Sequence, residues 1–403
     1  MAGRQPILSA VSLDLDPFAE EFLAAPYAHH EALREAGPVV LLAPIGCYGM
    51  ARHAEVQAAL RDWQTFVSSR GVGLADFQQE EPWRPPSLLL ETDPPLHDRT
   101  RSLMNRIVSL GALREVAARW QAVADDMIAR LVARGRFDGV EDLGAAFPLA
   151  VFPDLIGLRS AGREHLIPYA TAVFNAFGPR NAVFERGMAD AGPAMAWVAE
   201  ACRRDQLLPG GWGMQVYEAA DRGECTAGEA ERLVRSFLSA GVDTTVNGIA
   251  NLIHAFAMHP GQWQRLRQEP ALLKRAIEEG LRWDSTVQTF FRTTGRETCV
   301  AGVTLPANAK VLLFLAAANR DPRRWENADQ FDVGRQSSGH VGFGFGIHQC
   351  LGQMVARLEM EVLLRAMIPR VNSINLMGEP RRRINNTLHA LASLPVEFRA
   401  ATD

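Results

Sequence analysis

Residues 343–352 read Phe343-Gly344-Phe345-Gly346-Ile347-His348-Gln349-Cys350-Leu351-Gly352 and carry the strongest signal in the chain. One cysteine ends a glycine-rich loop and directly precedes an amphipathic helical run. Glycines let a backbone pass very close to a flat and bulky group. The amide groups at the start of the next helix point at the sulfur and favour its anionic form. The stretch therefore predicts a cysteine thiolate that serves as a metal ligand, and a small buried cysteine is the alternative.

Composition favours a globular protein and excludes several other classes. The chain has 403 residues, a hydrophobic content of 47% and a net charge of −4, so a large core is expected and a nucleic-acid partner is not. Its five cysteines include no C-x-x-C pair, which favours a reducing compartment over a disulfide framework. The N-terminus is a poor signal peptide, and the longest apolar run, 311–318, is too short to span a bilayer. We therefore expect a soluble cytoplasmic protein with no membrane partner.

Helical periodicity dominates the chain, and we expect one mainly α domain over residues 1–403 with small β-sheets. The predicted helices cover 54–60, 96–108, 113–135, 227–258 and a segment that begins at Pro270, and Gly111 is the expected breaker between the second and third. The predicted strands cover 38–42, 47–50, 299–305 and 310–314, with another pair near the C-terminus. Thr226 and Glu229 predict a capping box at the start of the 32-residue helix over 227–258.

An acid and an alcohol stand inside that long helix, in Ala240-Gly241-Val242-Asp243-Thr244-Thr245. Glycine and consecutive threonines are poor choices for a helix interior, and a threonine hydroxyl can bond back to a carbonyl and loosen the turn. Such a turn would make room for a small ligand. Asp243 and Thr244 would then supply the protons that oxygen activation consumes. A solvated aspartate at a helix kink is the alternative.

Two further patterns pair charged or imidazole side chains on one helix face. Glu279 and Arg282 lie at i and i+3, so they share one helix face and can pair with each other. Residues 93–101 place His97 and Arg101 four residues apart, also on one helix face. Any one of these pairs alone would more often be a surface feature, so their value lies in their order and position.

Taken together, these patterns resemble the cytochromes P450 of the soluble bacterial class, over nearly the whole chain. The loop matches F-x-x-G-x-H-x-C-x-G, residues 279–282 match E-x-x-R, and 93–101 match D-P-P-x-H-x-x-x-R. The resemblance implies a triangular, helix-rich prism around haem b, with Cys350 as the axial ligand of the iron. It implies that Asp243 and Thr244 are catalytic, and that Glu279, Arg282 and Arg335 form a bracing network. The implied haem-binding residues are His97, Arg101, Ala240, Gly241, Arg292, Phe343, Gly344, His348, Cys350 and Gly352.

Four other stretches, at 83–87, 173–179, 235–239 and 287–292, resemble the bacterial P450s that oxidise para-substituted benzoic acids such as 4-methoxybenzoate. This likeness implies hydroxylation or O-demethylation of a small aromatic carboxylic acid. Flat apolar side chains would enclose the ring, and arginine and serine would hold the carboxylate. The implied substrate-binding residues are Arg84, Ser87, Leu90, Phe174, Phe177, Arg235, Ser236, Ser239, Ala240, Val287 and Phe290.

The expected partners are dioxygen, an iron–sulfur ferredoxin and an NADH-dependent ferredoxin reductase, because about 50 residues after Cys350 leave no room for a flavin or nicotinamide domain. A positive face could attract an acidic ferredoxin. The arginines considered for this face are Arg99, Arg106, Arg114, Arg357 and Arg365.

Three alternatives to this function remain: oxidation of another small hydrophobic substrate, a peroxide-driven peroxygenase, and a haem-thiolate sensor without turnover. Asp243-Thr244 speaks against the peroxygenase, which usually carries arginine and proline there.

Overall fold

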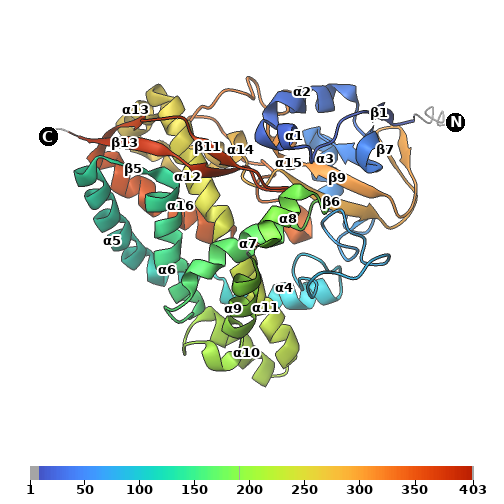
Figure 1. Cartoon of the computed structure of the whole chain (residues 1–403), viewed down its shortest axis with the longest axis horizontal. Coiled ribbons are helices and arrows are strands. Elements are labelled where there is room, and N and C mark those ends of the chain that lie inside the picture. Colours follow the sequence, from blue (N-terminus) through green and yellow to red (C-terminus); the bar gives the residue numbers. More distant parts are fainter. Residues whose placement is uncertain (1–8, 190, 402–403) are drawn as a thin grey trace.

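The computed structural model describes residues 9–189 and 191–401, and helices form most of it (Figure 1). The helices are α1 Glu20–Ala24, α2 Tyr27–Ala36, α3 His53–Arg61, α4 Leu96–Ile107, α5 Leu110–Arg134, α6 Ala146–Ile156, α7 Leu166–Asn175, α8 Ala182–Ala189, α9 Ala191–Ala201, α10 Trp212–Asp221, α11 Ala227–Ala240, α12 Asp243–Met258, α13 Pro260–Gln268, α14 Leu273–Trp283, α15 Leu315–Asn319 and α16 Gln353–Arg370. The predicted fold class, mainly α with small β-sheets, is therefore confirmed.

The strands gather into four small sheets. They are β1 Val11–Leu13, β2 Val40–Leu42, β3 Cys47–Met50, β4 Phe66–Val67, β5 Arg136–Asp138, β6 Thr289–Thr294, β7 Thr298–Val300, β8 Val303–Leu305, β9 Lys310–Phe314, β10 Val371–Leu376, β11 Arg381–Arg383, β12 Ala390–Ser393 and β13 Pro395–Ala400. The largest sheet has the order β1-β2-β3-β9-β6-β4, and a second has the order β10-β13-β5. Two hairpins, β7-β8 and β11-β12, complete the set.

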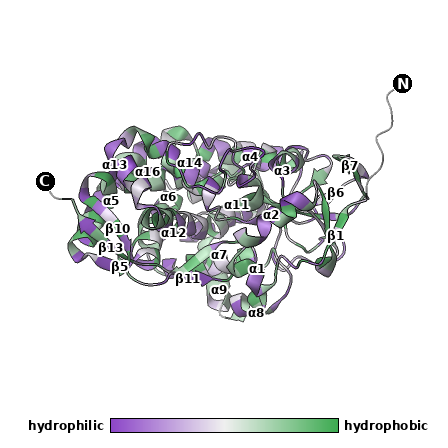
Figure 2. Cartoon of the chain, turned by 90° about the horizontal axis from the view of Figure 1, so that it is seen from above, coloured by the Kyte–Doolittle hydropathy of each residue, from purple (hydrophilic) through white to green (hydrophobic). Residues whose placement is uncertain are grey.

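Helix α12 lies at the centre of the helical part, and nearly all of its side chains are buried (Figures 1 and 2). Helices α5 and α16 pack closely against each other on one side of it. The large sheet lies on the opposite side, with helices α1 to α3 above it in the view of Figure 1. Within the described residues, we find no helix with the length and apolar character needed to cross a membrane.

The continuous helix predicted over 227–258 is wrong, because α11 ends at Ala240 and α12 begins at Asp243. The Thr244 hydroxyl donates to the Ala240 carbonyl at 2.8 Å, as expected for a threonine that loosens a turn. A Cβ on Gly241 would lie 2.2 Å from the Phe152 ring, so only glycine fits at the break. The capping box at the start of α11 is confirmed: Thr226 and Glu229 exchange side-chain to backbone bonds of 2.8 and 3.2 Å.

Gly111 is not the breaker that we predicted, since it lies in the first turn of α5. Ser109 caps this helix by accepting a bond from the amide of Ala112, and this fixes the start of the helix before the glycine.

The strand predicted over 299–305 is a hairpin of β7 and β8. Its turn contains Ala301 and Gly302, which both have positive φ, a conformation that ends a strand.

Glu279 and Arg282 of α14 form a fully buried ion pair, with N–O distances of 2.7 and 2.8 Å. Arg335 donates a third bond to Glu279 at 3.2 Å, and Ser337 a fourth at 2.6 Å. Arg282 also donates to the backbone carbonyls of Asn319, at the end of α15, and of Ala328 and Gln330, which follow it. This network joins α14 to the segment that leads into residues 343–352.

We predict that Arg282→Met destabilises the protein by about 3–5 kcal/mol, because the buried Glu279 charge loses its two-bond partner and keeps only the longer bond from Arg335 and that from Ser337. Thermal unfolding of the purified variant would measure the loss. Arg275→Met, on the exposed side of the same helix, is the matched control and should change stability by less than about 0.5 kcal/mol. Equal stability of the two variants would contradict the bracing role.

Candidate active site

One internal cavity of about 250 Å³ extends from residues 342–352 past the junction of α11 and α12 to residues 84–90. Its walls are mostly apolar, and its two ends carry polar groups. Nearly all of the predicted site residues line it. These are Arg84, Ser87, Leu90, Arg101, Phe174, Phe177, Ser236, Ser239, Ala240, Gly241, Thr244, Val287, Phe290, Arg292, Phe343, Gly344, His348, Cys350 and Gly352. His97, Arg235 and Asp243 lie behind this wall.

The Cys350 loop is held by its own backbone. The Cys350 amide donates to the carbonyl of Phe343 at 2.8 Å, and the Gly344 amide donates to that of Val341 at 2.8 Å. Gly344 and Gly346 both have positive φ, near 70°. A Cβ on Gly346 would also lie 2.5 Å from the carbonyl oxygen of Leu60. Position 346 therefore requires glycine for two reasons: its backbone conformation is left-handed, and there is no room for a Cβ.

Burial raises the pKa of the Cys350 thiol, and this effect is larger than the opposing ones. The amides of Gly352 and Gln353 and the charges of Arg101 and Arg357 lower the pKa, as expected for groups at a helix start. The prediction that the helix amides favour the anion is thus correct in direction, but they do not overcome burial by themselves. A bound metal cation would complete the ionisation.

Cationic and imidazole groups converge beside the loop, at one end of the cavity. The rings of His97 and His348 lie 4.4 Å apart, and the Nε2 atom of each is buried without a hydrogen-bond partner in the described structure. Burial, then the neighbouring His348, lowers the pKa of His97. Arg292 is fully buried with one bond to a backbone carbonyl, and burial lowers its pKa to about 10. It keeps its charge at neutral pH.

Asp243 is fully buried, and its carboxylate is surrounded by donors. Thr171 of α7 donates to it at 2.8 Å, Asn247 at 2.9 Å and Arg383 of β11 at 2.7 Å. The Arg383 side chain is 29% exposed, so it connects the buried carboxylate with solvent. Thr171 and Arg383 were missed because they lie far from Asp243 in the chain. Asn247 was also missed, although its i+4 spacing on the same helix face could have indicated it.

Aromatic rings form the middle of the cavity. Phe177 makes edge contacts with Phe174 and Phe290, with ring centroids 5.7 and 5.6 Å apart. Phe174 and Phe177 come from α7 and the residues just after it, whereas Phe290 comes from β6. Val287 and Leu90 close the remaining sides. The result is an apolar space bounded by flat side chains, as the sequence predicts.

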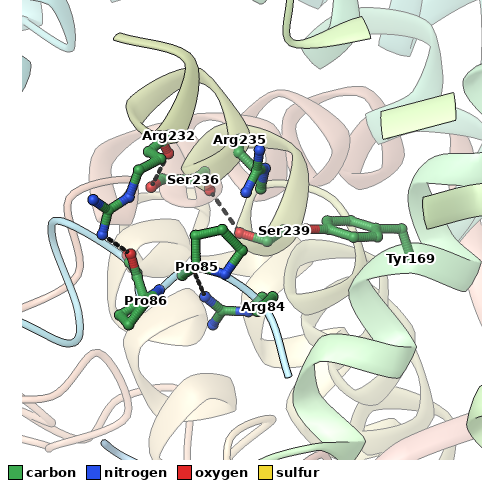
Figure 3. A pocket seen from close by; sticks show the side chains of 9 residues that line it. Arg84, Pro85, Pro86, Tyr169, Arg232, Arg235, Ser236 and Ser239 are labelled. Atoms are coloured by element: carbon green, nitrogen blue, oxygen red, sulfur yellow. Dashed lines mark hydrogen bonds between the residues drawn. The ribbon is translucent and has the colours of Figure 1, made fainter. Parts of the chain in front are cut away.

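The far end of the cavity adjoins a small polar pocket between α11 and residues 84–87 (Figure 3). Arg84 forms a 3.1 Å ion pair with the buried Glu91, so its charge is already balanced, which the sequence did not indicate. Arg235 pairs with Glu231 at 2.9 Å. Arg232, which sequence reasoning missed, donates to the carbonyl of Pro86. The serine hydroxyls of α11 bond within their own helix, Ser236 to Arg232 and Ser239 to Ser236.

Two other findings differ from the sequence-based picture. Glu359 of α16 is fully buried, its carboxylate oxygens have no hydrogen-bond partner within the described residues, and burial raises the pKa of that carboxyl well above its usual range. In addition, the positive face expected from five arginines is largely neutralised, because four of them form ion pairs. These pairs are Arg99–Glu229, Arg106–Glu224, Arg357–Glu278 and Arg365–Glu361.

Comparison with known proteins identifies the family. Residues 214–399 match the family described as Cytochrome P450. The chain is 52% identical over 390 residues to cytochrome p450 CYP199A2 of Rhodopseudomonas palustris, which covers 96% of this chain and 95% of that protein. It is 31% identical over 355 residues to the vitamin D(3) 25-hydroxylase of Pseudonocardia autotrophica, which covers 87% of each. The structure of CalO2 superposes with a TM-score of 0.84 at 26% identity, over 97% of this chain and 99% of that one. The chain therefore belongs to the cytochrome P450 family and is a monooxygenase.

The family implies a haem with cysteine thiolate ligation, and the residues present fit such a group. Cys350 faces the cavity from a rigid loop. The unpaired Nε2 atoms of His97 and His348, with Arg101 and Arg292, suit two propionates that require donors and positive charge. Arg101 donates one bond to Asn105 and Arg292 one to the Phe291 carbonyl, and His348 Nε2 lies 3.7 Å from Asp93, so each cation keeps further donors that a propionate could use.

We expect Cys350→Ala to lose the red-shifted absorption band that the reduced, carbon monoxide-treated protein should show, because the thiolate ligand is removed. Difference spectroscopy of the purified variant tests this. Cys299→Ala, at an exposed cysteine of the β7-β8 hairpin, is the control and should retain the band. A normal band in Cys350→Ala would mean that another residue ligates the iron.

Proposed function

We propose that this monooxygenase hydroxylates or O-demethylates small aromatic carboxylic acids, with a para-substituted benzoate such as 4-methoxybenzoate as the type of substrate. The observation that carries the proposal is the polarity of the cavity. Its middle is aromatic, one end is Cys350, and the opposite end is bordered by arginines and serines. A planar acid bound with its carboxylate at the polar end would direct its para substituent toward Cys350.

Charge at the polar end supports an anionic ligand. Three guanidinium groups, from Arg84, Arg232 and Arg235, face two carboxylates, from Glu91 and Glu231, so one positive charge is left over. The Nε atoms of Arg84 and Arg232 are buried and have no hydrogen-bond partner within the described residues. An anion buried without partners is costly, whereas charge-assisted hydrogen bonds are the strong ones. A substrate carboxylate would use both the spare charge and the unused donors.

Serine hydroxyls would complete the carboxylate site. Ser87, Ser236 and Ser239 border both the cavity and the small pocket. Figure 3 shows Ser236 and Ser239 on α11 beside the small pocket. The oxygen of Ser87 accepts bonds from the amides of Leu89 and Leu90, at 3.3 and 3.2 Å, which leaves its own hydrogen available to donate. Ser236 and Ser239 can turn from their helix carbonyls to the ligand, because a hydroxyl has one rotatable donor.

Asp243 and Thr244 would supply protons to the reaction, on the side of the cavity next to Ala240. Haem, when bound, activates dioxygen, and the protein must then deliver protons while it excludes bulk water. Arg383 and Thr171 orient the Asp243 carboxylate, and Arg383 connects it with solvent. Thr244 lines the cavity itself. The pair therefore connects the surface with the reaction centre through one turn of α12.

Demethylation of a methoxy group consumes one dioxygen, two electrons and two protons, and it releases the phenol, formaldehyde and water. We propose that the electrons come from NADH through a reductase and an iron–sulfur ferredoxin, and that residues 1–403 form one haem domain. Because four surface arginines are paired with carboxylates, apolar contacts and shape would contribute more to ferredoxin docking than a broad positive field.

The carboxylate site predicts that 4-methoxybenzoate binds more than about tenfold more tightly than its methyl ester, a difference of about 1.4 kcal/mol. The double variant Ser87→Ala/Ser236→Ala should lose most of this preference, because donors to a charged group are removed. Titration of the haem spin shift measures both affinities. Ser102→Ala, an exposed serine of α4, is the control. Equal affinity of the wild-type protein for acid and ester would exclude the carboxylate site.

The proton-delivery pair predicts that Thr244→Ala binds substrate normally but loses product relative to NADH consumed, with hydrogen peroxide as the side product. Proton transfer by a positioned side chain is typically worth about 10²–10⁴-fold, so Asp243→Asn should slow turnover within that range. Product, peroxide and NADH are measured in the same reaction. Thr245→Ser, which keeps a hydroxyl at the next position, is the control. Unchanged coupling in Thr244→Ala would reject the assigned role.

A further inference from the structure

The chain contains 42 basic Lys and Arg residues, of which only Lys274 and Lys310 are lysines. Lys310 begins β9, and its ammonium donates to three backbone carbonyls, those of Arg70, Gly71 and Gly73, at 3.1, 3.1 and 3.0 Å. An ammonium has three donors around one nitrogen and can bind three carbonyls that converge on a single point, whereas a guanidinium spreads its donors over three nitrogens in one plane. The geometry of the three carbonyls therefore favours lysine at position 310.

Residues 70–77, which we call the clasp, are folded tightly around this ammonium. Arg70 closes the segment by pairing with Asp76 and also donates to Asn308. Gly71 has a φ of 93°, and a Cβ there would lie 2.8 Å from the carbonyl oxygen of Ala75. Burial lowers the pKa of Lys310 to about 8, against the opposing effect of Asp76, so the ammonium remains largely charged at neutral pH.

Three consecutive clasp residues hold both aromatic walls of the cavity. The carbonyl of Val72 accepts a bond from the amide of Phe291, next to Phe290, at 2.9 Å. The amide of Leu74 donates to the carbonyl of Phe177 at 2.8 Å. Between them, Gly73 lies so close to Phe177 that a Cβ would be 2.7 Å from its Cα. The backbones that carry Phe177 and Phe290 are thus positioned by the same short segment.

We infer that Lys310 is a specificity-determining residue, because it locks the clasp and so fixes the spacing between Phe177 and Phe290. The two ring centroids are 5.6 Å apart, and both rings line the cavity. Without the ammonium, three carbonyl dipoles would face one another, and the clasp would relax. Phe177 would then be free to move away from Phe290, and the cavity would admit thicker or bent ligands. The inference rests on the aromatic cavity of the proposed function but needs no particular substrate.

The test compares a ligand that contacts the aromatic walls of the cavity with a smaller one that does not reach them. In the haem-bound protein, 4-phenylimidazole and imidazole both ligate iron, but only the first extends a flat ring into the cavity. We expect Lys310→Met, which keeps the apolar stem, to lower the affinity ratio of the two ligands about tenfold, as expected for a poorer apolar fit. Lys274→Met, at the other lysine, is exposed and should leave the ratio unchanged.

Gly73→Ala tests the same wall with Lys310 intact, since its Cβ would displace Phe177 directly. We expect it to lower the ratio in the same way, while the carbon monoxide band of both variants stays normal. An unchanged ratio in Gly73→Ala and Lys310→Met would overturn the inference, and so would an equal loss of affinity for both imidazoles. If the wild-type protein bound 4-phenylimidazole tightly and no benzoate at all, the proposed substrate would fail while the role of Lys310 would stand.

Discussion

Burial of the Cys350 sulfur is the constraint on which the rest of the structure depends. An apolar environment raises the pKa of the thiol, so a thiolate there requires a cation and a rigid surrounding backbone. The loop provides the backbone, through glycines at positive φ and amide bonds such as that from Cys350 to the Phe343 carbonyl. The Glu279–Arg282–Arg335 network then ties the segment before this loop to α14. The residues that stabilise the fold here therefore also hold the loop that carries Cys350.

The second constraint is the junction of α11 and α12. In the proposed function, this helix pair would provide a carboxylate-binding surface at one end and a proton pathway at the other. The break at Gly241 lets Ala240 and Thr244 face the cavity while Asp243 points away, toward Arg383 and Thr171. In this backbone a Cβ at position 241 would meet the Phe152 ring, so the junction requires glycine. The weak helix residues at 240–245 are thus a requirement of the site, even though they cost local helix stability.

The sequence was sufficient to predict those parts of the fold and site that depend on local pattern. The Cys350 loop and the capping box of Thr226 and Glu229 are set by residues close together in the chain. The aromatic lining was predicted from the family resemblance instead, because Phe177 and Phe290 lie far apart in sequence. The weak helix residues at 240–245 indicated a loosened turn, but not that the helix ends at Ala240. The contact that requires glycine at 241, with the Phe152 ring, lies about 90 residues away in the chain. Arg383 was missed for the same reason, since a β-strand arginine carries no local sign of its partner.

Charge balance is the property that the sequence conceals most completely. Arg84 looks like a free cation in the chain, yet the buried Glu91 neutralises it, and the positive charge left for a ligand emerges only when Arg232 and Arg235 are counted together with Glu231. Lys310 shows the opposite case. One of two lysines in an arginine-rich chain carries no signal as sequence, but three carbonyls that converge on its single nitrogen suit an ammonium better than a planar guanidinium. In both places the tertiary environment, rather than the residue type alone, decides whether a cationic side chain is paired within the protein or remains available to a ligand.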